Sequence, residues 1–572
     1  MYGFVITKGC AYQGSRLSEA YELSFGDTHF YYHQLPKFEK DHLFFQNDSL
    51  IVLLDGVVFN KAELLAQAGS DDWAAVFLGL YAEEGERVAS RLRGSFCGVI
   101  FEKASGRLLA FTNQSGERPV YYGSFVGMFC LASHVTILTE LMAAQGIPVK
   151  PDIQSCRQLM GLGSILHGGT PVQGLRRLTA GKLLLWADGQ GEEQRYHMFH
   201  NVPEHEMSLD ECVDELDRRF RQAIDRIYGK NREYGYQAEC DLSGGLDSRL
   251  ATWVAHDLGY RDILNVCYCQ TGKIDHKTSR KIAADLGNEY YFLPLDGGEF
   301  IKDIDETTEK FGGQVTFVIC TGANRAMREV ARHNIGLCVT GLLGELHNAY
   351  GVQGDTHTPP DFTSNRYSSA VPVVIPDAYK DDYENYEQMN FYEHYALLML
   401  SSALVRQQQC EVTSPYVDVD FLEFSYRVPL KWRRHFQLTM TWMVKKYPKC
   451  ADYVWQTKRM PVSSYFYGQT YLPKIGDDVV RFAKRVCNKI FRTLHVQTLL
   501  SFSDDMNPFE VWYANNPDLR RFIDAYFREN LPLVQDAALR ADIEKTFSSG
   551  GITDKLQALS LLSVWKLYFS KV

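Results

Sequence analysis

Short apolar runs separated by glycine-bearing turns dominate the first third of the chain. The runs at residues 50–54, 95–101 and 108–111 have the length and composition of strands, and Ala104-Ser105-Gly106 is typical of a turn between two of them. One helix is expected around residues 72–84. Residues 1–195 are therefore expected to form a β-rich domain with few helices.

From about residue 210 the pattern changes to long helices that alternate with short apolar strands. Residues 210–228 form an amphipathic helix, with apolar side chains on one face. Strands are expected at 236–242, 263–269, 290–295 and 337–340, and helices at 277–286 and 323–333. Repeated βα units predict a parallel sheet with helices on both faces and ligands at the carboxyl ends of its strands. The sequence thus predicts a two-domain protein, combining α+β and α/β architecture, with domains at 1–195 and 210–572.

Composition narrows the classes of protein to consider. At 572 residues the chain exceeds the size of one core, and its 45% hydrophobic and 23% charged residues are those of a soluble globular protein. A net charge of −10 argues against a nucleic-acid partner bound through phosphates. We expect no membrane span or signal peptide, and the 13 scattered cysteines indicate neither a disulfide framework nor a zinc site. The cytoplasm is the expected compartment.

The segment Ser243-Gly244-Gly245-Leu246-Asp247-Ser248 lies between a predicted strand and a predicted helix. Glycines allow close approach to a phosphate, the first N–H groups of a helix bind anions, and Asp247 could bind a divalent cation. The alternative is an ordinary turn with a serine N-cap. The Walker lysine is missing. The segment resembles the pyrophosphate-binding loop of the ATP pyrophosphatase superfamily, which implies ATP as substrate, with Ser243, Gly244, Gly245, Asp247 and Ser248 as its binding residues.

A second resemblance covers nearly the whole chain. Several segments occur in the order of the landmarks of the asparagine synthetase glutaminase domain: Met1-Tyr2-Gly3-Phe4, Asp55-Gly56-Val57-Val58-Phe59-Asn60, Ser70-Asp71-Asp72, Leu92-Arg93-Gly94-Ser95-Phe96 and Gly116-Glu117-Arg118-Pro119-Val120-Tyr121-Tyr122. Together with the loop at Ser243, they make the chain similar to the asparagine synthetase family. The resemblance implies an N-terminal-nucleophile (Ntn) hydrolase-like β-sandwich followed by a parallel-sheet ATP pyrophosphatase domain.

Two residues depart from the glutaminase pattern. The family uses an N-terminal cysteine as nucleophile, and Tyr2 stands in its place; a phenol with a pKa near 10 is a poor nucleophile. Asp55 replaces an asparagine of the oxyanion pair, and a carboxylate repels a developing oxyanion. Cys10 is expected to be a half-buried strand thiol. We therefore expect glutamine hydrolysis to be lost and the domain to be retained for packing or for guarding the synthetase entrance.

The segment Thr340-Gly341-Leu342-Leu343-Gly344-Glu345-Leu346 resembles a second family motif. In gap-free register Gly341 belongs to the nucleotide site, Glu345 takes the place of a metal-binding aspartate, and Leu342 replaces a glutamate. The resemblance implies that Asp247 and Glu345 hold Mg²⁺ between the phosphates. The alternative for Glu345 is a solvated loop carboxylate.

Two further segments resemble family motifs near the end of the synthetase domain. In residues 411–418 an arginine has become Thr413; Glu411 is expected to be structural, with a catalytic role facing the substrate as the alternative. Lys458 in residues 457–461 is the expected electrostatic catalyst for the acyl-adenylate, with Arg459 as the fallback and a solvated surface pair as the alternative. A family arginine falls at Val318, and whether Arg325 or Arg328 replaces it is left open.

Together these features predict an AMP-forming carbon–nitrogen ligase that couples a carboxylate to an amine through an acyl-adenylate. Leu342, Thr413 and Val318 speak against aspartate as acceptor, so we expect a specialised enzyme similar to β-lactam synthetases and lasso-peptide cyclases. Asparagine-type amidation with ammonia and a catalytically silent ATP-binding scaffold are the alternatives. The expected partners are small-molecule or peptide substrates, and the choice between monomer and homodimer stays open. Residues 355–395 are interpreted as a substrate-covering loop or a surface insertion.

Overall fold

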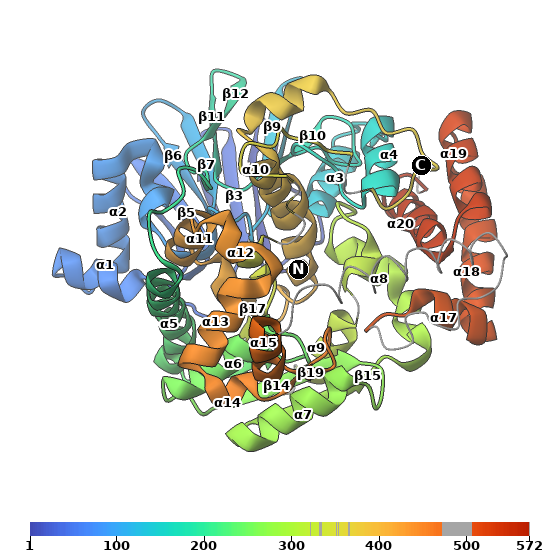
Figure 1. The fold of residues 1–572 in the computed structure, drawn as a ribbon. Coiled ribbons are helices and arrows are strands. Elements are labelled where there is room, and N and C mark those ends of the chain that lie inside the picture. The colour runs from blue at the N-terminus through green and yellow to red at the C-terminus, as the bar shows by residue number, and fades with distance from the viewer. Residues whose placement is uncertain are drawn as a thin grey trace.

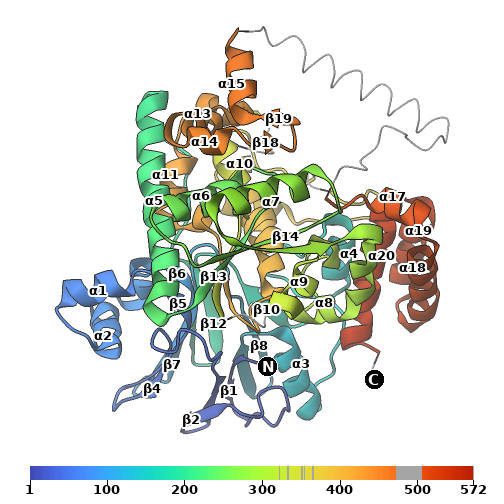
Figure 2. The same cartoon turned by 90° about the horizontal axis from the view of Figure 1, so that it is seen from below.

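The computed structural model describes residues 1–320, 322–330, 334–349, 352, 354–363, 366–471 and 506–570. Figures 1 and 2 show two domains stacked on each other, with the N-terminal strands in blue and the helices of the second domain in green to orange. None of the helices in these described ranges is long and apolar enough to cross a membrane.

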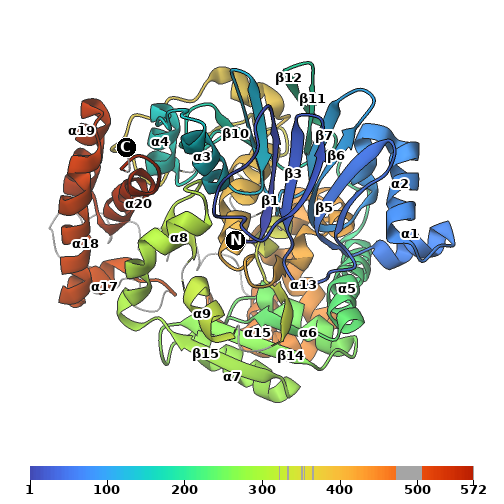
Figure 3. The same cartoon turned by 180° about the vertical axis from the view of Figure 1, so that it is seen from behind.

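The N-terminal domain consists of two antiparallel six-stranded sheets packed face to face (Figure 3). The first has the order β10-β8-β9-β1-β3-β2, with strands at Leu175–Leu178, Val120–Phe125, Met128–Ala132, Gly3–Lys8, Thr28–His33 and Tyr21–Phe25. The second has the order β12-β11-β7-β6-β5-β4, with strands at Gln190–Arg195, Lys182–Ala187, Arg107–Thr112, Gly94–Glu102, Leu50–Val58 and Leu43–Gln46. Alternate apolar side chains of both sheets, such as Phe4, Leu53 and Val99, fill the space between them.

Helices cover the outer faces of this sandwich. On the second sheet lie α1 (Lys61–Ala68), α2 (Trp73–Glu84) and the 3₁₀ segment η1 (Gly85–Arg91). On the first lie α3 (Val135–Ala144) and α4 (Ile153–Leu162). The helix expected at 72–84 is α2, which begins after Asp72 because the side chain of Asp72 accepts a hydrogen bond from the Ala75 N–H at 3.1 Å.

The second domain is built on a five-stranded parallel sheet of order β15-β14-β13-β16-β17. The strands are Glu289–Pro294, Ile263–Cys269, Gln237–Asp241, Ile335–Val339 and Glu411–Thr413. Helices α5 (Leu209–Tyr234) and α6 (Asp247–Asp257) pack on one face, and α9 (Ala323–Val330) packs on the other. The strand order reverses direction between β13 and β16, and such a switch point is where parallel sheets bind ligands.

Several expected elements differ from the structure in length. Helix α5 continues six residues beyond the predicted end at 228 and stops where Gly235 adopts a left-handed conformation. Helix α7 (Ile274–Leu286) begins three residues earlier than predicted. Of the helix expected at 323–333, α9 ends at Val330 and residues 331–333 lie outside the described residues.

The end of the chain returns to the N-terminal domain. Helices α17 (Phe509–Asn515), α18 (Pro517–Asn530), α19 (Ala537–Ser549) and α20 (Ile552–Tyr568) form the red group beside α4 and α8 (Ile304–Lys310) in Figure 1. Their apolar side chains share one core with α3 and α4. The expected class is confirmed: an Ntn-hydrolase-like antiparallel sandwich joined to a parallel-sheet domain of the adenine nucleotide α-hydrolase type.

Candidate active site

The glycine-rich segment at Ser243 forms the connection from β13 to α6, at the switch point of the parallel sheet. The Ser248 Oγ accepts a hydrogen bond from the Ser243 N–H at 3.1 Å, and the Ser243 Oγ accepts one from the Gly245 N–H at 3.1 Å. These bonds fold the segment into a compact turn at the first residues of α6, where helical N–H groups have no partner within the helix. The local geometry is that of an anion-binding loop.

Three residues that the sequence interpretation missed hold this loop from outside. The Asp275 Oδ1 accepts a hydrogen bond from the Gly244 N–H at 2.7 Å. The Gly244 carbonyl accepts bonds from the fully buried Arg249 side chain at 3.0 Å and from the Gln456 N–H at 3.2 Å. Asp275 follows the carboxyl end of β14, so its position after a predicted strand was a usable signal; Gln456 gave none.

The segment after β16 packs directly against this loop. A Cβ atom at Gly341 would lie 2.6 Å from the Ser248 backbone nitrogen, and one at Gly344 would lie 2.3 Å from the Asp247 Cγ. Real side chains do not approach so closely, so both positions require glycine. Gly341 therefore lies at the loop, as the resemblance implies, and Glu345 follows directly on the glycine that touches Asp247.

Asp247 and Glu345 form a pair of carboxylates at this contact. Burial, and then the charge of Glu345, raise the pKa of Asp247 well above its usual range; burial also raises the pKa of Glu345. The Asp247 Oδ1 is buried without a hydrogen-bond partner among the described residues. Two adjacent carboxylates with an unsatisfied oxygen suit a hard divalent cation, so these residues fit Mg²⁺. This arrangement favours the metal interpretation of Glu345 over the solvated one.

Lys458 lies on a segment that contacts the loop through Gln456. The Cβ of Gln456 would be 3.2 Å from a Cβ at Gly244, and the Lys458 N–H donates to the Trp455 carbonyl at 3.2 Å. The Lys458 Nζ lies 4.5 Å from the centre of the Tyr465 ring. The backbone of Lys458 is thus close to the phosphate loop, and its electrostatic role stays a prediction. The two arginines considered as replacements for the family arginine at Val318 form ion pairs with other residues. Arg325 pairs with Asp303, and Arg328 pairs with Glu306.

Glu411 does not lie at the nucleotide edge of the sheet. It is the first residue of β17, it is 0% exposed, and its carboxylate pairs with Arg118 of the N-terminal domain. This contact joins two residues that are 293 positions apart in the sequence, and it buries the carboxylate of Glu411 between the domains. The catalytic alternative for Glu411 is therefore not supported. The structural interpretation fits this geometry.

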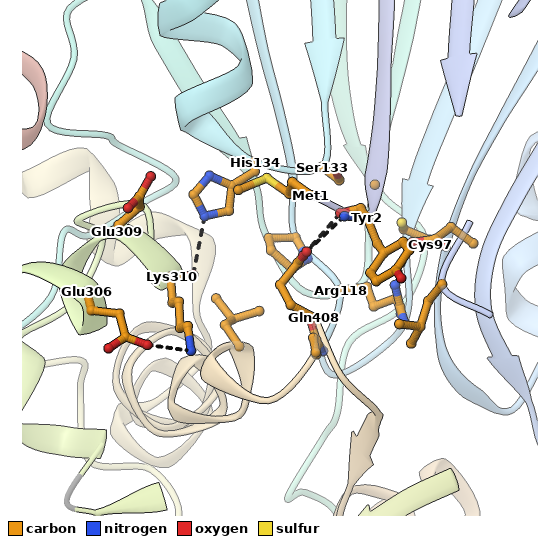
Figure 4. Close-up of a pocket in the computed structure, with 16 residues that line it drawn as sticks. Met1, Tyr2, Cys97, Arg118, Ser133, His134, Glu306, Glu309, Lys310 and Gln408 are labelled. Carbon is orange, nitrogen blue, oxygen red and sulfur yellow. Dashed lines mark hydrogen bonds and ion pairs between the residues drawn. The ribbon is translucent and has the colours of Figure 1, made fainter. Parts of the chain in front are cut away.

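Tyr2, at the position of the family nucleophile, borders a cavity of about 300 Å³ between the domains. Figure 4 shows Tyr2 and Arg118 on one side, His134 and Lys310 on the other, and Gln408 between them. The Gln408 side chain accepts a hydrogen bond from the Tyr2 N–H at 2.8 Å and donates one to the Tyr2 carbonyl at 3.1 Å. The backbone at the nucleophile position is thus held by the synthetase domain.

Asp55 lies at the wall of this cavity in a buried ionic cluster. The Arg118 Nη1 contacts the Asp55 Oδ2 at 2.5 Å, and Tyr32 donates to the Asp55 Oδ1 at 2.8 Å. Burial alone would raise the pKa of Asp55, but the charge of Arg118 and the bond from His42 hold it well below its usual range. Asp55 is therefore ionised at neutral pH, and a fixed negative charge stands where the family pattern has an oxyanion-binding asparagine.

Glu117, next to Arg118, gives a testable pH dependence. Burial raises its pKa to about 7 from an ordinary value of 4.5, against hydrogen bonds from Ser115, Thr413 and Asn113 that lower it. The folded state then binds the proton more tightly than the unfolded state, so stability falls as pH rises from about 4.5 to about 7, by about 3 kcal/mol. Urea unfolding of Glu117→Gln at pH 5 and pH 7.5 is expected to lack this slope.

The matched control is Glu83→Gln, because Glu83 is exposed. This variant should keep the wild-type dependence of unfolding free energy on pH. A slope in Glu117→Gln equal to that of wild type would contradict the assignment.

Comparisons with known proteins show partial similarity to amidotransferases and asparagine synthetases. The sequence profile of a family described as a glutamine amidotransferase domain matches residues 26–197. Asparagine synthetase [glutamine-hydrolyzing] 1 of Bacillus subtilis is 22% identical over 278 residues, covering 47% of this chain and 43% of the relative. A probable asparagine synthetase of Acanthamoeba polyphaga mimivirus is 23% identical over 325 residues, covering 54% and 56%. The chain thus spans about half the length of the curated relatives it matches.

Solved structures give weaker matches. The glutamine phosphoribosylpyrophosphate amidotransferase of B. subtilis is 11% identical, covering 52% of this chain and 85% of that one, with a TM-score of 0.23. The NH3-dependent NAD synthetase of Campylobacter jejuni is 18% identical, covering 26% and 62%, with a TM-score of 0.19. At these scores the fold assignment depends on the strand order and packing described above.

The protein is therefore of the class that joins an amidotransferase-type sandwich to an ATP pyrophosphatase-type domain. Within this class, the chain is a distant homologue of asparagine synthetases, to which it is similar over about half of its length.

Proposed function

We propose that the protein is an AMP-forming ligase that activates a substrate carboxylate with ATP and couples it to an amine. The observation that carries this proposal is the carboxylate pair Asp247 and Glu345 beside a glycine-walled anion loop, with the Asp247 Oδ1 unsatisfied. Such a site suits the metal-bound polyphosphate of a nucleotide.

In the proposed mechanism, the loop at Ser243 to Ser248 and the segment 340–346 have different tasks. Backbone N–H groups and hydroxyls of Ser243 to Ser248 bind the phosphates, and Asp247 and Glu345 would hold Mg²⁺, which supplies charge neutralisation. A substrate carboxylate oxygen attacks the α-phosphorus, forming the acyl-adenylate and releasing pyrophosphate. An amine then attacks the acyl carbon, loses its proton and expels AMP, leaving an amide. Lys458 stabilises the negative charge that develops on the departing groups.

The nitrogen, in this proposal, does not come from the N-terminal domain. Tyr2 offers no thiolate, Asp55 carries a fixed negative charge beside Arg118, and the Met1 ammonium donates to the Arg16 carbonyl at 3.0 Å. Arg118, which lines the cavity beside Tyr2, is ion-paired with Glu411, and Arg406 is ion-paired with Asp241 at the end of the strand that leads to the Ser243 loop. These features support free ammonia or a substrate amine as the nitrogen source.

The acceptor is proposed to be a specialised carboxylate rather than aspartate. Two altered positions serve packing and domain contacts: Leu342 borders an apolar cluster, and the Thr413 hydroxyl donates to Glu117 at 3.0 Å. Neither supplies charge for a small charged amino acid. Asparagine-type amidation with ammonia is the second candidate. The two curated relatives, an asparagine synthetase and a probable one, favour its asparagine-forming part, although both are named as glutamine-hydrolysing.

ATP–pyrophosphate exchange with a panel of carboxylates, with and without ammonium, tests the proposal. We expect exchange with at least one carboxylate other than aspartate. Exchange with aspartate alone would support the second candidate, and exchange with none would favour a silent ATP-binding scaffold.

A glutaminase assay tests the nitrogen source separately. We expect no release of glutamate from glutamine above the buffer rate, because the chain lacks both the thiolate and a neutral oxyanion donor. The Tyr2→Phe variant is the control and should give the same result. Turnover at the rate of a cysteine-bearing relative would refute the loss.

A further inference from the structure

Residues 406–413, here called the bridging segment, contain residues that contact each of the two domains. Arg406 donates to the Asp241 Oδ2 at 2.8 Å and to the Glu239 Oε2 at 3.2 Å, on the strand that ends in the phosphate loop. The next residue, Gln407, donates to the Glu117 carbonyl at 3.0 Å, and Gln408 bonds to both backbone groups of Tyr2. Three consecutive side chains thus connect β13 to the N-terminal domain.

The last three residues of the bridging segment are strand β17, which forms the edge of the parallel sheet. Two of its side chains contact the N-terminal domain. The Arg118 Nη2 donates to the Glu411 Oε1, and the Thr413 hydroxyl donates to the Glu117 Oε1 at 3.0 Å. A three-residue edge strand has few ladder bonds of its own, so these contacts fix its position.

From β17 the contacts continue into the metal site. The Thr340 N–H donates to the Thr413 carbonyl at 2.9 Å, and the Ser414 hydroxyl donates to the Leu342 carbonyl at 2.7 Å. The Tyr416 hydroxyl donates to the Asp247 carbonyl at 3.0 Å. The backbone on both sides of Gly341, and that of Asp247, is therefore anchored on the strand that Arg118 holds.

We infer that Arg118 is a positioning residue of the synthetase: through Glu411 and β17 it fixes the segment 340–346 that brings Glu345 to Asp247. This inference rests on the proposed function for its catalytic meaning, although the contacts themselves do not depend on it. It assigns the N-terminal domain a task in the ATP site that needs no glutamine chemistry.

The same contacts account for Asp55. A buried guanidinium is costly unless its charge is compensated, and Arg118 lies between Asp55 and Glu411 with 8% of its surface exposed. The aspartate that is unsuited to an oxyanion site thus serves as the second counter-ion of Arg118. Asp55, at the wall of the cavity beside Tyr2, therefore holds Arg118 in place, and Arg118 in turn holds Glu411 of β17.

The test uses the full-length protein with Glu411→Gln, which leaves the Arg118–Asp55 pair intact, and with Arg118→Lys, which keeps the charge but loses the two-sided contact. The matched control is Arg157→Met, which breaks another ion pair between the N-terminal sandwich and the rest of the chain, Arg157 with Asp542 at 2.9 Å. Two measurements are made: hydrogen exchange of the amides in 340–346, and the Mg²⁺ dependence of α,β-methylene-ATP binding.

For both variants we expect amide exchange in 340–346 to become at least about tenfold faster and the half-saturating Mg²⁺ concentration to rise at least about fivefold. Arg157→Met should change neither. Loss of general stability alone would not shift the Mg²⁺ dependence of binding by folded protein.

Unchanged exchange in 340–346 and unchanged Mg²⁺ dependence in either folded variant would overturn the inference. Slower amide formation with both quantities unchanged would also overturn it, because it would place Glu411 in the chemical step. If wild type does not bind the analogue, the proposed function fails, and the exchange rates of 340–346 still decide the inference.

Discussion

The substitution Asp247→Asn is expected to lower the rate of ATP–pyrophosphate exchange at least about a hundredfold. Asparagine keeps the shape of the side chain but removes the charge that would hold Mg²⁺ with Glu345, and transition-state charge stabilisation by a metal is worth several kcal/mol. The unsatisfied Asp247 Oδ1 indicates that this side chain has no other buried role to lose. Exchange is measured at saturating substrate over a range of Mg²⁺ concentrations.

Asp257→Asn is the matched control, since Asp257 lies at the other end of α6 and pairs with Arg221 near the surface. It should leave exchange within about twofold of wild type. Retention of most activity in Asp247→Asn would exclude this carboxylate from the metal site.

The second large effect is on stability, and it concerns Arg433. This side chain is 0% exposed, pairs with Glu387, and donates to the Tyr426 carbonyl at 2.9 Å and the Leu346 carbonyl at 2.8 Å. Arg433→Met leaves Glu387 buried without its counter-ion, so the free energy of unfolding is expected to fall by about 3–5 kcal/mol. Urea denaturation followed by fluorescence measures it.

The control is Arg427→Met. Arg427 is only partly buried and its side chain donates one hydrogen bond to the Pro203 carbonyl, so the substitution should cost less than about 1 kcal/mol. The double variant Arg433→Met/Glu387→Met should recover part of the loss, because no unpaired charge remains. A single variant as stable as wild type would show that the pair is not buried as described.

Arg433 also contacts the segment that carries Glu345, so a substitution that lowers the free energy of unfolding can also disturb the proposed metal site. Its bond to the Leu346 carbonyl holds the residue directly after Glu345. We therefore expect partly destabilised variants of Arg433 to lose affinity for Mg²⁺ before they unfold.

Local patterns were sufficient to predict the strand, turn and helix that carry Ser243 to Ser248, because a strand, two glycines and a helix start are contiguous in sequence. Gly341 and Glu345 could be placed beside that loop because parallel strands end at a common edge. The chemical roles of these residues and of Lys458 stay predictions.

Contacts between distant segments could not be predicted. Glu411 was assigned an alternative catalytic role because nothing near it in sequence reveals Arg118, 293 residues away. Helix α5 was predicted to end early because its apolar pattern stops at Ile227, whereas in the fold Lys230 is buried and pairs with Asp41 of the other domain. Arg249 and Gln456 hold the loop through bonds to a carbonyl, which leave no pattern in the sequence.

The close contacts at Gly341 and Gly344 bear on how this protein could be engineered if it has the proposed ligase activity. Libraries aimed at new acceptor carboxylates should leave both glycines unchanged, since any side chain there would push against Ser248 or Asp247. Leu342, between them, is partly exposed and borders an apolar cluster. Diversity placed at this single position would alter the wall of the site while keeping the spacing of the two loops.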